Sequence, residues 1–313
     1  MTKTARIIFM GTPEFAVPAL RALHKNDHDV VLVVTQPDCP KGRGRQISAP
    51  PVKKAAVDLG YTILQPPSVR SSEFSNIITK YEPDFIVVVA FGRIITKNIL
   101  DIPKIAAINI HASLLPKYRG AAPIQWAIIN GETKTGVTTM LMDEGLDTGD
   151  ILLSSQVEIS NDETSGTLHD RLSNLGADLL MQTLNAFETG DIHPVPQDHS
   201  QATYAPMFKK NDGHIGWKKP AQSLEMFIRG MTPWPGAFTF HREKRLKIFK
   251  AKAISDNVAN TPGTIIKGFP DELWIATGQG VLSVLEIQGE SGKRLSIRDF
   301  LRGYALPPGA QLH

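Results

Sequence analysis

Two polar residues at alternate positions of one apolar segment are candidates for chemistry. Asn109 and His111 are separated by Ile110 and follow Ile108. Because successive side chains of a strand point to opposite faces, the amide and the imidazole should project from the same face. An amide can stabilise an oxyanion and an imidazole can carry a proton, and acyl transfer requires both functions.

A carboxylate is the third group that such a site needs. Asp147 lies in a turn rich in Gly and Asp, after the apolar run from Val137 to Met142. It is the nearest downstream acid that could hold the tautomer of the His111 ring. The simpler alternative is that Asn109 and His111 are satisfied polar residues of an ordinary strand, and the motif chemistry alone leaves both interpretations open.

The chain around this segment alternates between expected strands and helices. Apolar, β-branched runs predict strands covered on both faces, and the segments between them have helical spacing. The alternation predicts an α/β fold with a Rossmann-like, mostly parallel sheet. Ligands of such sheets bind at the carboxyl ends of the strands, so Asn109 and Phe91–Gly92 should line one crevice. Besides the Asn109–His111 strand, we expect strands at residues 6–10, 30–34, 61–64, 84–90, 137–142 and 151–159.

The pattern changes after residue 207, where short apolar segments separated by Gly, Pro or Asp predict a small β-barrel. We therefore expect a catalytic domain over residues 1–188, a linker over 189–207 and a second domain over 208–313. Residues 207–313 carry 16 Lys and Arg against 9 Asp and Glu, whereas residues 1–206 carry 18 against 22. A basic module suggests a polyanionic partner, although lysines that only keep the module soluble explain the charge equally well.

Composition argues against several classes of protein. No apolar run approaches the roughly 20 residues that span a bilayer, and the N-terminal run Ile7–Met10 is too short for a secretion signal, so we expect a cytoplasmic protein. The single cysteine, Cys39, excludes an intramolecular disulfide. The nine histidines show no metal-ligand spacing, so no metal is expected. Only Gly11 is present where a dinucleotide fingerprint needs three glycines, so NAD binding is not expected.

A polar loop over residues 35–50 is longer than a typical connection between a strand and a helix. It is rich in Gly and Pro, and its cations Lys41, Arg43 and Arg45 have no acid after Asp38. Guanidinium groups on such a loop could bind phosphates. A solvated loop without a ligand is the simpler interpretation of the composition.

The wider string around the polar pair resembles a known family. Asn109-x-His111 is followed by Ser-Leu-Leu-Pro-Lys-Tyr-Arg-Gly, and Asp147 lies within Gly-Leu-Asp-Thr-Gly-Asp. This order is similar to the signature of the formyltransferases that use 10-formyltetrahydrofolate. The resemblance extends over nearly the whole chain, with further matches at Gly11-Thr-Pro-Glu-Phe15, Gln36-Pro-Asp-x-Pro-x-Gly-Arg-Gly44 and Pro233-Trp-Pro-Gly-Ala237.

The resemblance implies that Asn109, His111 and Asp147 are catalytic. The chain most resembles the branch of the family that formylates methionyl initiator tRNA, in which the basic loop inserts at the acceptor end and an OB-like β-barrel cradles the tRNA backbone. The residues implied to hold folate are Phe91, Gly92, Ser113, Leu114, Leu115 and Pro116. The residues implied to contact tRNA are Lys41, Arg43, Arg45, Lys244, Arg245 and Lys247.

Other interpretations are compatible with parts of the chain. Relatives that act on glycinamide ribonucleotide resemble only the first domain. Those that act on an amino sugar nucleotide, or that belong to formyltetrahydrofolate dehydrogenase, usually continue into a large second catalytic domain, for which a chain ending at His313 leaves no room. A nucleic-acid adaptor without activity would not need Asn109, His111 and Asp147. We therefore expect a cytoplasmic monomer that formylates methionyl initiator tRNA and supports translation initiation.

Overall fold

The structure, a computed structural model, describes residues 5–41, 46–256, 258–268, 270–290 and 292–313. The chain forms two compact units whose segments alternate along the sequence. The first unit comprises Met1–Gly120, Thr135–Val157 and His169–Ala205, and the second comprises Ala121–Lys134, Glu158–Leu168 and Pro206–His313. Most of the stretch over 189–207, where the sequence suggests a linker, therefore groups with the first unit.

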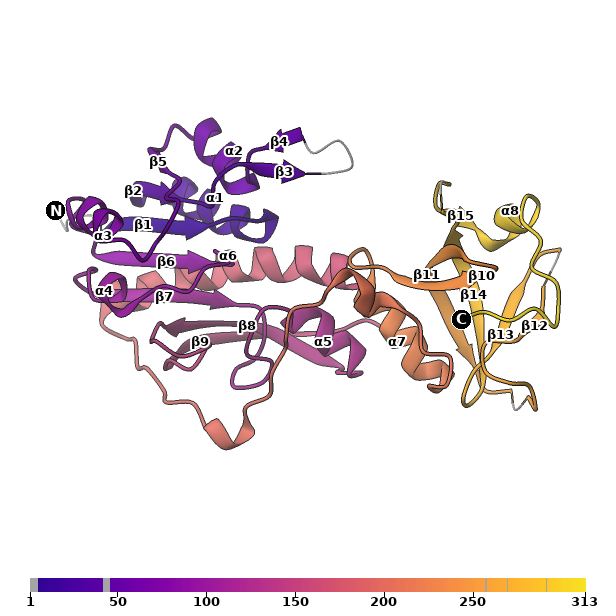
Figure 1. Ribbon diagram of the computed structural model, residues 1–313. Coiled ribbons are helices and arrows are strands. Elements are labelled where there is room, and N and C mark those ends of the chain that lie inside the picture. The colour runs from indigo at the N-terminus through magenta and orange to yellow at the C-terminus, as the bar shows by residue number, and fades with distance from the viewer. Residues whose placement is uncertain (1–4, 42–45, 257, 269, 291) are drawn as a thin grey trace. The chain divides into compact units, whose positions relative to one another are not determined.

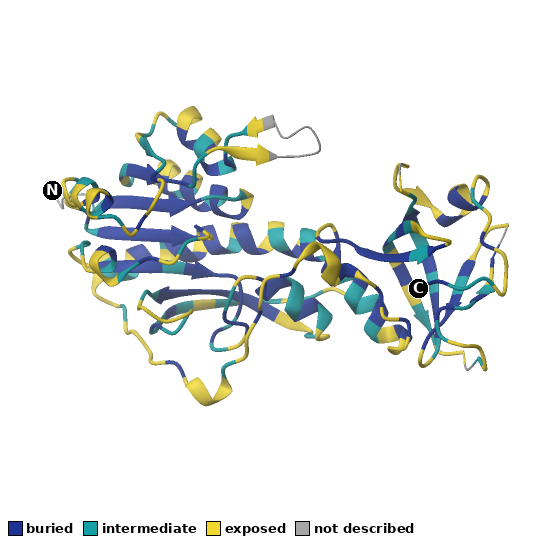
Figure 2. Cartoon of the chain, viewed as in Figure 1, coloured by how far each residue is buried: buried dark blue, intermediate teal, exposed yellow. Residues whose placement is uncertain are grey.

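The first unit is built on a seven-stranded sheet with the order β5-β2-β1-β6-β7-β8-β9. The pairs from β5 to β7 are parallel, and β8 pairs antiparallel with β7. The central strands are buried along their length, which explains their continuous apolar sequence (Figure 2). The strands are β1 (Arg6–Gly11), β2 (Asp29–Val34), β5 (Ile63–Leu64), β6 (Phe85–Val89), β7 (Ala106–His111), β8 (Lys134–Leu141) and β9 (Ile151–Glu158).

Helices cover both faces of this sheet (Figure 1). On one face Phe74 of α3 packs in a cluster with Ile86 of β6. On the other face α6 lies so close to β7 that a Cβ at Gly176 would come 2.9 Å from Ile110 Cγ2. The predicted α/β class with a Rossmann-like sheet is confirmed. The helices are α1 (Val17–Lys25), α2 (Pro51–Asp58), α3 (Ser72–Thr79), α4 (Lys97–Leu100) and α6 (Ser165–Thr189).

Part of the predicted basic loop forms a two-stranded hairpin of the first unit. Its antiparallel strands are β3 (Cys39–Lys41) and β4 (Gln46–Ser48). Arg43 and Arg45 lie outside the described residues, as does the side chain of Lys41. The proposed role of this loop therefore rests on the sequence.

The second unit contains an antiparallel sheet of six strands that curls into part of a barrel (Figure 1), which confirms the predicted OB-like domain. Its core also includes α5, because Trp126 and Ile129 pack against a cluster that contains Ile228 of α7. The strands are β10 (Ala237–His241), β11 (Lys244–Ile254), β12 (Ile265–Lys267), β13 (Leu273–Ala276), β14 (Val281–Gln288) and β15 (Leu295–Ser296), and the helices are α5 (Pro123–Ile129), α7 (Ala221–Met231) and α8 (Ile297–Leu301).

The described part of the chain contains no helix long and apolar enough to cross a membrane. Within the same residues, no group of three or more His, Cys, Asp or Glu side chains is placed to hold a metal ion.

Candidate active site

Strand β7 presents the Asn109 amide and the His111 ring on one face of the first unit's sheet. Parallel β6 lies on one side of the strand and antiparallel β8 on the other, with Asn109 opposite Val88 and Met140. Ile110 points to the other face, toward α6. Asn109 is partly exposed, and its side-chain amide has no hydrogen-bond partner among the described residues. The amide is therefore available to a ligand at the carboxyl end of the strand.

The His111 ring is held between two partners. His111 is 6% exposed, and its Nε2 lies 2.9 Å from the carbonyl oxygen of Tyr118. A carbonyl oxygen only accepts hydrogen bonds, so Nε2 carries a hydrogen in this arrangement. The other ring nitrogen, Nδ1, lies 3.6 Å from Oδ2 of Asp147. Proton exchange at this ring therefore falls to Nδ1, beside the carboxylate.

Asp147 is fixed in the turn between β8 and β9. Its backbone is left-handed, with φ of 54°, and its side chain is 15% exposed. Oδ2 accepts a hydrogen bond from the backbone N–H of Gly120 at 2.8 Å. The turn is tight, because a Cβ at Gly149 would lie 1.9 Å from the carbonyl oxygen of Leu141. The structure thus brings together the three residues that the sequence singles out for catalysis.

Phe91 and Gly92, predicted to contact folate, follow the carboxyl end of β6. Phe91 is 2% exposed, and its carbonyl oxygen accepts hydrogen bonds from Thr12 Oγ1 at 2.9 Å and Gln36 Nε2 at 2.8 Å. Gly92 is exposed with φ of 76°, and a Cβ there would come 2.6 Å from Gln36 Nε2. This corner therefore offers the backbone of Gly92 to a ligand rather than the Phe91 ring.

The other predicted folate contacts, Ser113, Leu114, Leu115 and Pro116, form the turn after β7. The Ser113 hydroxyl donates to the carbonyl oxygen of Lys117 at 2.6 Å, and Ser113 is fully buried. Leu115 is also buried, whereas Leu114 and Pro116 are partly exposed. The surface of this turn that can meet a ligand is therefore mainly apolar.

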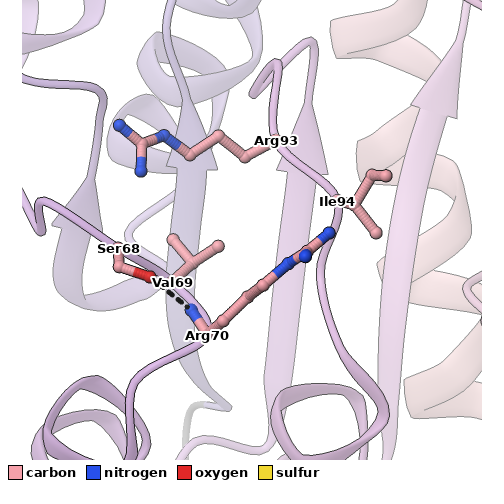
Figure 3. Close-up of a pocket in the computed structure, with 5 residues that line it drawn as sticks. All are labelled: Ser68, Val69, Arg70, Arg93 and Ile94. Carbon is pink, nitrogen blue, oxygen red and sulfur yellow. Dashed lines mark hydrogen bonds between the residues drawn. The ribbon is translucent and has the colours of Figure 1, made fainter.

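A cavity of about 340 Å³ is lined by the segments that follow β5 and β6 (Figure 3). Both strands are parallel members of the sheet, so their carboxyl ends lie at the same edge as that of β7. Two arginines line the cavity, and Arg93 Nη1 donates to the carbonyl oxygen of Pro67 at 2.6 Å. The lining residues are Ser68, Val69, Arg70, Arg93 and Ile94.

The second unit carries the other predicted tRNA contacts on β11. Lys244 is exposed, and Arg245 and Lys247 are partly exposed. The Arg245 guanidinium carbon lies 3.6 Å from the centre of the Phe238 ring, and its Nε and Nη2 are buried without a hydrogen-bond partner in the described part of the chain. Burial lowers the pKa of Arg245. This strand presents cations of both types, one of them stacked on an aromatic ring.

Three polar residues to which the sequence analysis assigns no role form hydrogen bonds around the backbone segments beside His111. Gln197 Nε2 donates to the carbonyl oxygens of Asp147 and Gly149, and Gln197 Oε1 accepts from Arg119, which is only 2% exposed. Thr203 Oγ1 accepts the backbone N–H of Tyr118. Gln197 and Thr203 lie in a segment without periodicity, so no local pattern marks them, whereas Arg119 stands within the family-like string.

Two family models match this chain over most of its length. The model described as formyl transferase matches residues 5–184, and the model described as formyl transferase, C-terminal domain, matches residues 207–305. The chain belongs to the formyl transferase family.

Several curated relatives that this chain resembles are named methionyl-tRNA formyltransferase. A methionyl-tRNA formyltransferase of Citrifermentans bemidjiense is 53% identical over 307 residues, which cover 98% of this chain and 96% of that protein. A methionyl-tRNA formyltransferase of Caldanaerobacter subterraneus subsp. tengcongensis is 49% identical, with coverage of 98% and 99%. A solved N-formyltransferase from Helicobacter canadensis, in complex with folinic acid and dTDP-3-aminofucose, covers 94% of this chain and 100% of its own with a TM-score of 0.68. At 18% identity, that last likeness shows a shared fold.

Proposed function

We propose that this protein transfers the formyl group of 10-formyltetrahydrofolate to the amino group of methionyl initiator tRNA, and so supports translation initiation. The observation that carries the proposal is the meeting of Asn109, His111 and Asp147 at one sheet edge in a member of the formyl transferase family. Relatives about as long as this chain and close to half identical to it carry the name methionyl-tRNA formyltransferase. We expect the enzyme to act as a monomer in the cytoplasm.

The reaction exchanges one nitrogen for another on the formyl carbon. The neutral methionyl amine forms a bond to that carbon, the bond to N10 of the folate breaks, and the proton lost by the amine ends on N10. Negative charge develops on the formyl oxygen during the exchange. The free amide of Asn109 and an N–H of protonated His111 are the donors that would stabilise it.

His111 and Asp147 would move the proton. The Tyr118 carbonyl occupies Nε2–H, so Nδ1 is the nitrogen that takes up and releases the proton. When Nδ1 is protonated, the Asp147 carboxylate at 3.6 Å stabilises the imidazolium. Protonated His111 would release its Nδ1 proton to N10, and a water ordered by Asp147 would accept the amine proton and return it to Nδ1, so that the ring ends as it began. Burial of the pair strengthens these interactions because bulk water is excluded.

The folate would lie along the carboxyl edge of the sheet. The apolar surface of Leu114 and Pro116 and the backbone of Gly92 suit a pterin ring, which is flat and carries polar atoms at its rim. The cavity lined by Arg70 and Arg93 suits the carboxylates of the glutamate part, because guanidinium groups pair with carboxylates. The Helicobacter canadensis relative was solved with folinic acid, which is also a folate.

The tRNA would be held by cations of both units. We assign Lys41, Arg43 and Arg45 to the acceptor end, and Lys244, Arg245 and Lys247 to the tRNA backbone. Exposed lysines attract phosphates over long distances, and the partly exposed Arg245, stacked on Phe238, adds a further positive charge on the same strand. The affinity for tRNA should therefore fall as salt is raised.

The deciding experiment locates a labelled formyl group. The protein is incubated with labelled 10-formyltetrahydrofolate and, in parallel, with methionylated initiator tRNA, methionylated elongator tRNA, glycinamide ribonucleotide and an amino sugar nucleotide. We expect the label on initiator tRNA and equimolar release of tetrahydrofolate. Label on either nucleotide would assign a different substrate. Binding of tRNA without any formyl transfer would indicate a nucleic-acid adaptor without activity.

The Asn109→Ala variant tests the site within the same assay. Loss of one oxyanion donor should lower turnover by about 10²–10³-fold. Asn185→Ala, at an exposed position of α6, is the matched control and should retain wild-type turnover. Normal turnover of a folded Asn109→Ala protein would reject the assigned role.

A further inference from the structure

Residues 195–205, here called the strap, run across the edge of the first unit that carries the site. The strap begins beside β9, where Val195 and Ile151 exchange two backbone hydrogen bonds of 2.9 Å. It ends beside the turn after β7, where Arg119 donates to the Thr203 carbonyl and accepts from the N–H of Ala205, both at 2.8 Å. The strap is thus fixed at both ends to segments that carry site residues.

One strap residue holds the backbone that faces His111 Nε2. The Tyr118 carbonyl, which accepts from Nε2, belongs to a residue with φ of 61°. Residues other than Gly rarely adopt this backbone conformation, so contacts with the surrounding structure must hold it. The N–H of Tyr118 donates to Thr203 Oγ1 at 2.8 Å. The hydroxyl of Thr203 therefore helps to set where the Tyr118 carbonyl points.

A second strap residue, Gln197, holds the backbone of Asp147, the residue whose carboxylate faces His111 Nδ1. Asp147 is also left-handed, with φ of 54°. Gln197 Nε2 donates to the Asp147 carbonyl at 2.9 Å and to the Gly149 carbonyl at 2.7 Å. The orientation of the Gln197 amide is itself fixed, because its Oε1 accepts from Arg119 Nε at 3.1 Å and Nη2 at 2.6 Å.

We propose that Gln197 and Thr203 are positioning residues for formyl transfer, which hold the two backbone segments on either side of the His111 ring. This inference rests on the proposed function. Neither side chain needs to touch a substrate, since each acts through Asp147 or Tyr118. Displacement of a reacting group by about 1 Å can lower a rate by about 10²-fold, so the loss of one such bond should reduce turnover more than substrate binding.

Two near-isosteric variants separate positioning from packing. Thr203→Val keeps the shape of the side chain but removes the acceptor for the Tyr118 N–H, whereas Thr203→Ser keeps the hydroxyl. Gln197→Glu keeps oxygen acceptors for Arg119 but replaces the donor to the two carbonyls. Gln201→Ala is the control on the same strap, because the Gln201 amide donates only to the exposed Asp198 carboxylate among the hydrogen bonds described.

We expect kcat to fall about 10- to 100-fold in Thr203→Val and Gln197→Glu, with KM for both substrates within about twofold of wild type. Thr203→Ser should restore kcat to within about threefold, and Gln201→Ala should match wild type. Thermal melting establishes that each variant is folded. Wild-type kcat in folded Thr203→Val, an equal loss in Thr203→Ser, or a rise in KM at constant kcat would overturn the proposal. If Gln197→Glu does not fold, the Thr203 pair still decides.

A readout without turnover separates this inference from the proposed function. In protein with ¹⁵N-labelled histidine, the ring signals of His111 are identified by their loss in His111→Gln. Neutral His111 should carry its hydrogen on Nε2 in the wild type, and Thr203→Val should shift the tautomer population toward Nδ1–H. An unchanged His111 spectrum in Thr203→Val would refute the positioning role even if the protein proved to transfer no formyl group.

Discussion

The site edge of the first unit and the basic strand β11 of the second unit use polar residues in opposite ways. At the edge that carries Asn109, His111 and Asp147, the side chains of His111 and Asp147 are largely buried, and both lie beside fixed partners. On β11, Lys244, Lys250 and Lys252 are exposed at the ends of long side chains. Chemistry on a single carbon requires fixed geometry, whereas attraction of a polyanion requires only charge at the surface.

This difference predicts that changes in the first unit act on turnover and changes on β11 act on affinity. The largest effect is expected for His111→Gln, which removes the proton carrier. Its kcat should fall about 10²–10⁴-fold while the affinity for initiator tRNA stays unchanged. His193→Gln, at an exposed position of the first unit, is the control. A large loss of tRNA affinity in His111→Gln would erase the distinction between the regions.

Gly149→Ala tests how strictly geometry matters at the site edge. The added Cβ would lie 1.9 Å from the Leu141 carbonyl oxygen, so the backbone of the Asp147 turn must shift. We expect kcat to fall about 10- to 100-fold and the free energy of unfolding to fall by about 1–3 kcal/mol. Gly216→Ala in the second unit, where an added Cβ meets no atom within 4 Å, should leave both unchanged. Steady-state kinetics and urea unfolding measure the two quantities, and unaltered turnover in Gly149→Ala would show that the turn tolerates displacement.

The double variant Lys244→Ala/Lys247→Ala should act through charge. We expect a several-fold higher KM for tRNA, an unchanged kcat and an unchanged KM for the folate. The dependence of log affinity on log salt should become shallower by about 0.7–0.9 for each phosphate that the variant no longer neutralises. The control removes two exposed lysines of the first unit, Lys25 and Lys80. An equal effect of the control pair would mean that overall charge, rather than β11, sets the affinity.

The smallest effect is expected on the pH dependence of stability through His241, which is 4% exposed in β10. Burial, and then the charges of Arg242 and Lys244, lower its pKa in the folded protein. The folded state then binds fewer protons than the unfolded state, so stability is complete above the unfolded pKa of about 6.5 and decreases as pH falls below it. Urea unfolding at pH 7.5 and 5.5 should show a smaller decrease for His241→Gln than for wild type, and equal decreases would contradict the expectation.

The sequence predicts much of the fold because its signals are local. Continuous apolar runs mark β1, β2 and β6, and the alternation of Asn109 and His111 with isoleucines places both on one face of β7. The family-like string adds Asp147, which lies 36 residues after His111 in sequence yet 3.6 Å from its ring. Their catalytic roles, like the folate and tRNA contacts, remain predictions.

What the sequence does not reveal depends on contacts between distant segments. Gln197 and Arg119 are 78 residues apart, and Thr203 and Tyr118 are 85 residues apart. No periodicity or sequence spacing predicts either pair. The left-handed backbone of Tyr118 is held by tertiary contacts, since Tyr rarely adopts it, whereas Asp147 is a residue type that tolerates this conformation. The buried Phe91 ring and the bonded Ser113 hydroxyl likewise became apparent only from their surroundings.

The alternation of the two units along the chain has a practical consequence for protein engineering. Residues 121–134 and 158–168 belong with the second unit although they lie within the first 188 residues. A fragment that ends near residue 206 would lack the apolar residues against which Trp126 of α5 packs, and would leave that side chain exposed. An exchange of the second unit between two members of the family would therefore have to transplant three stretches of sequence together.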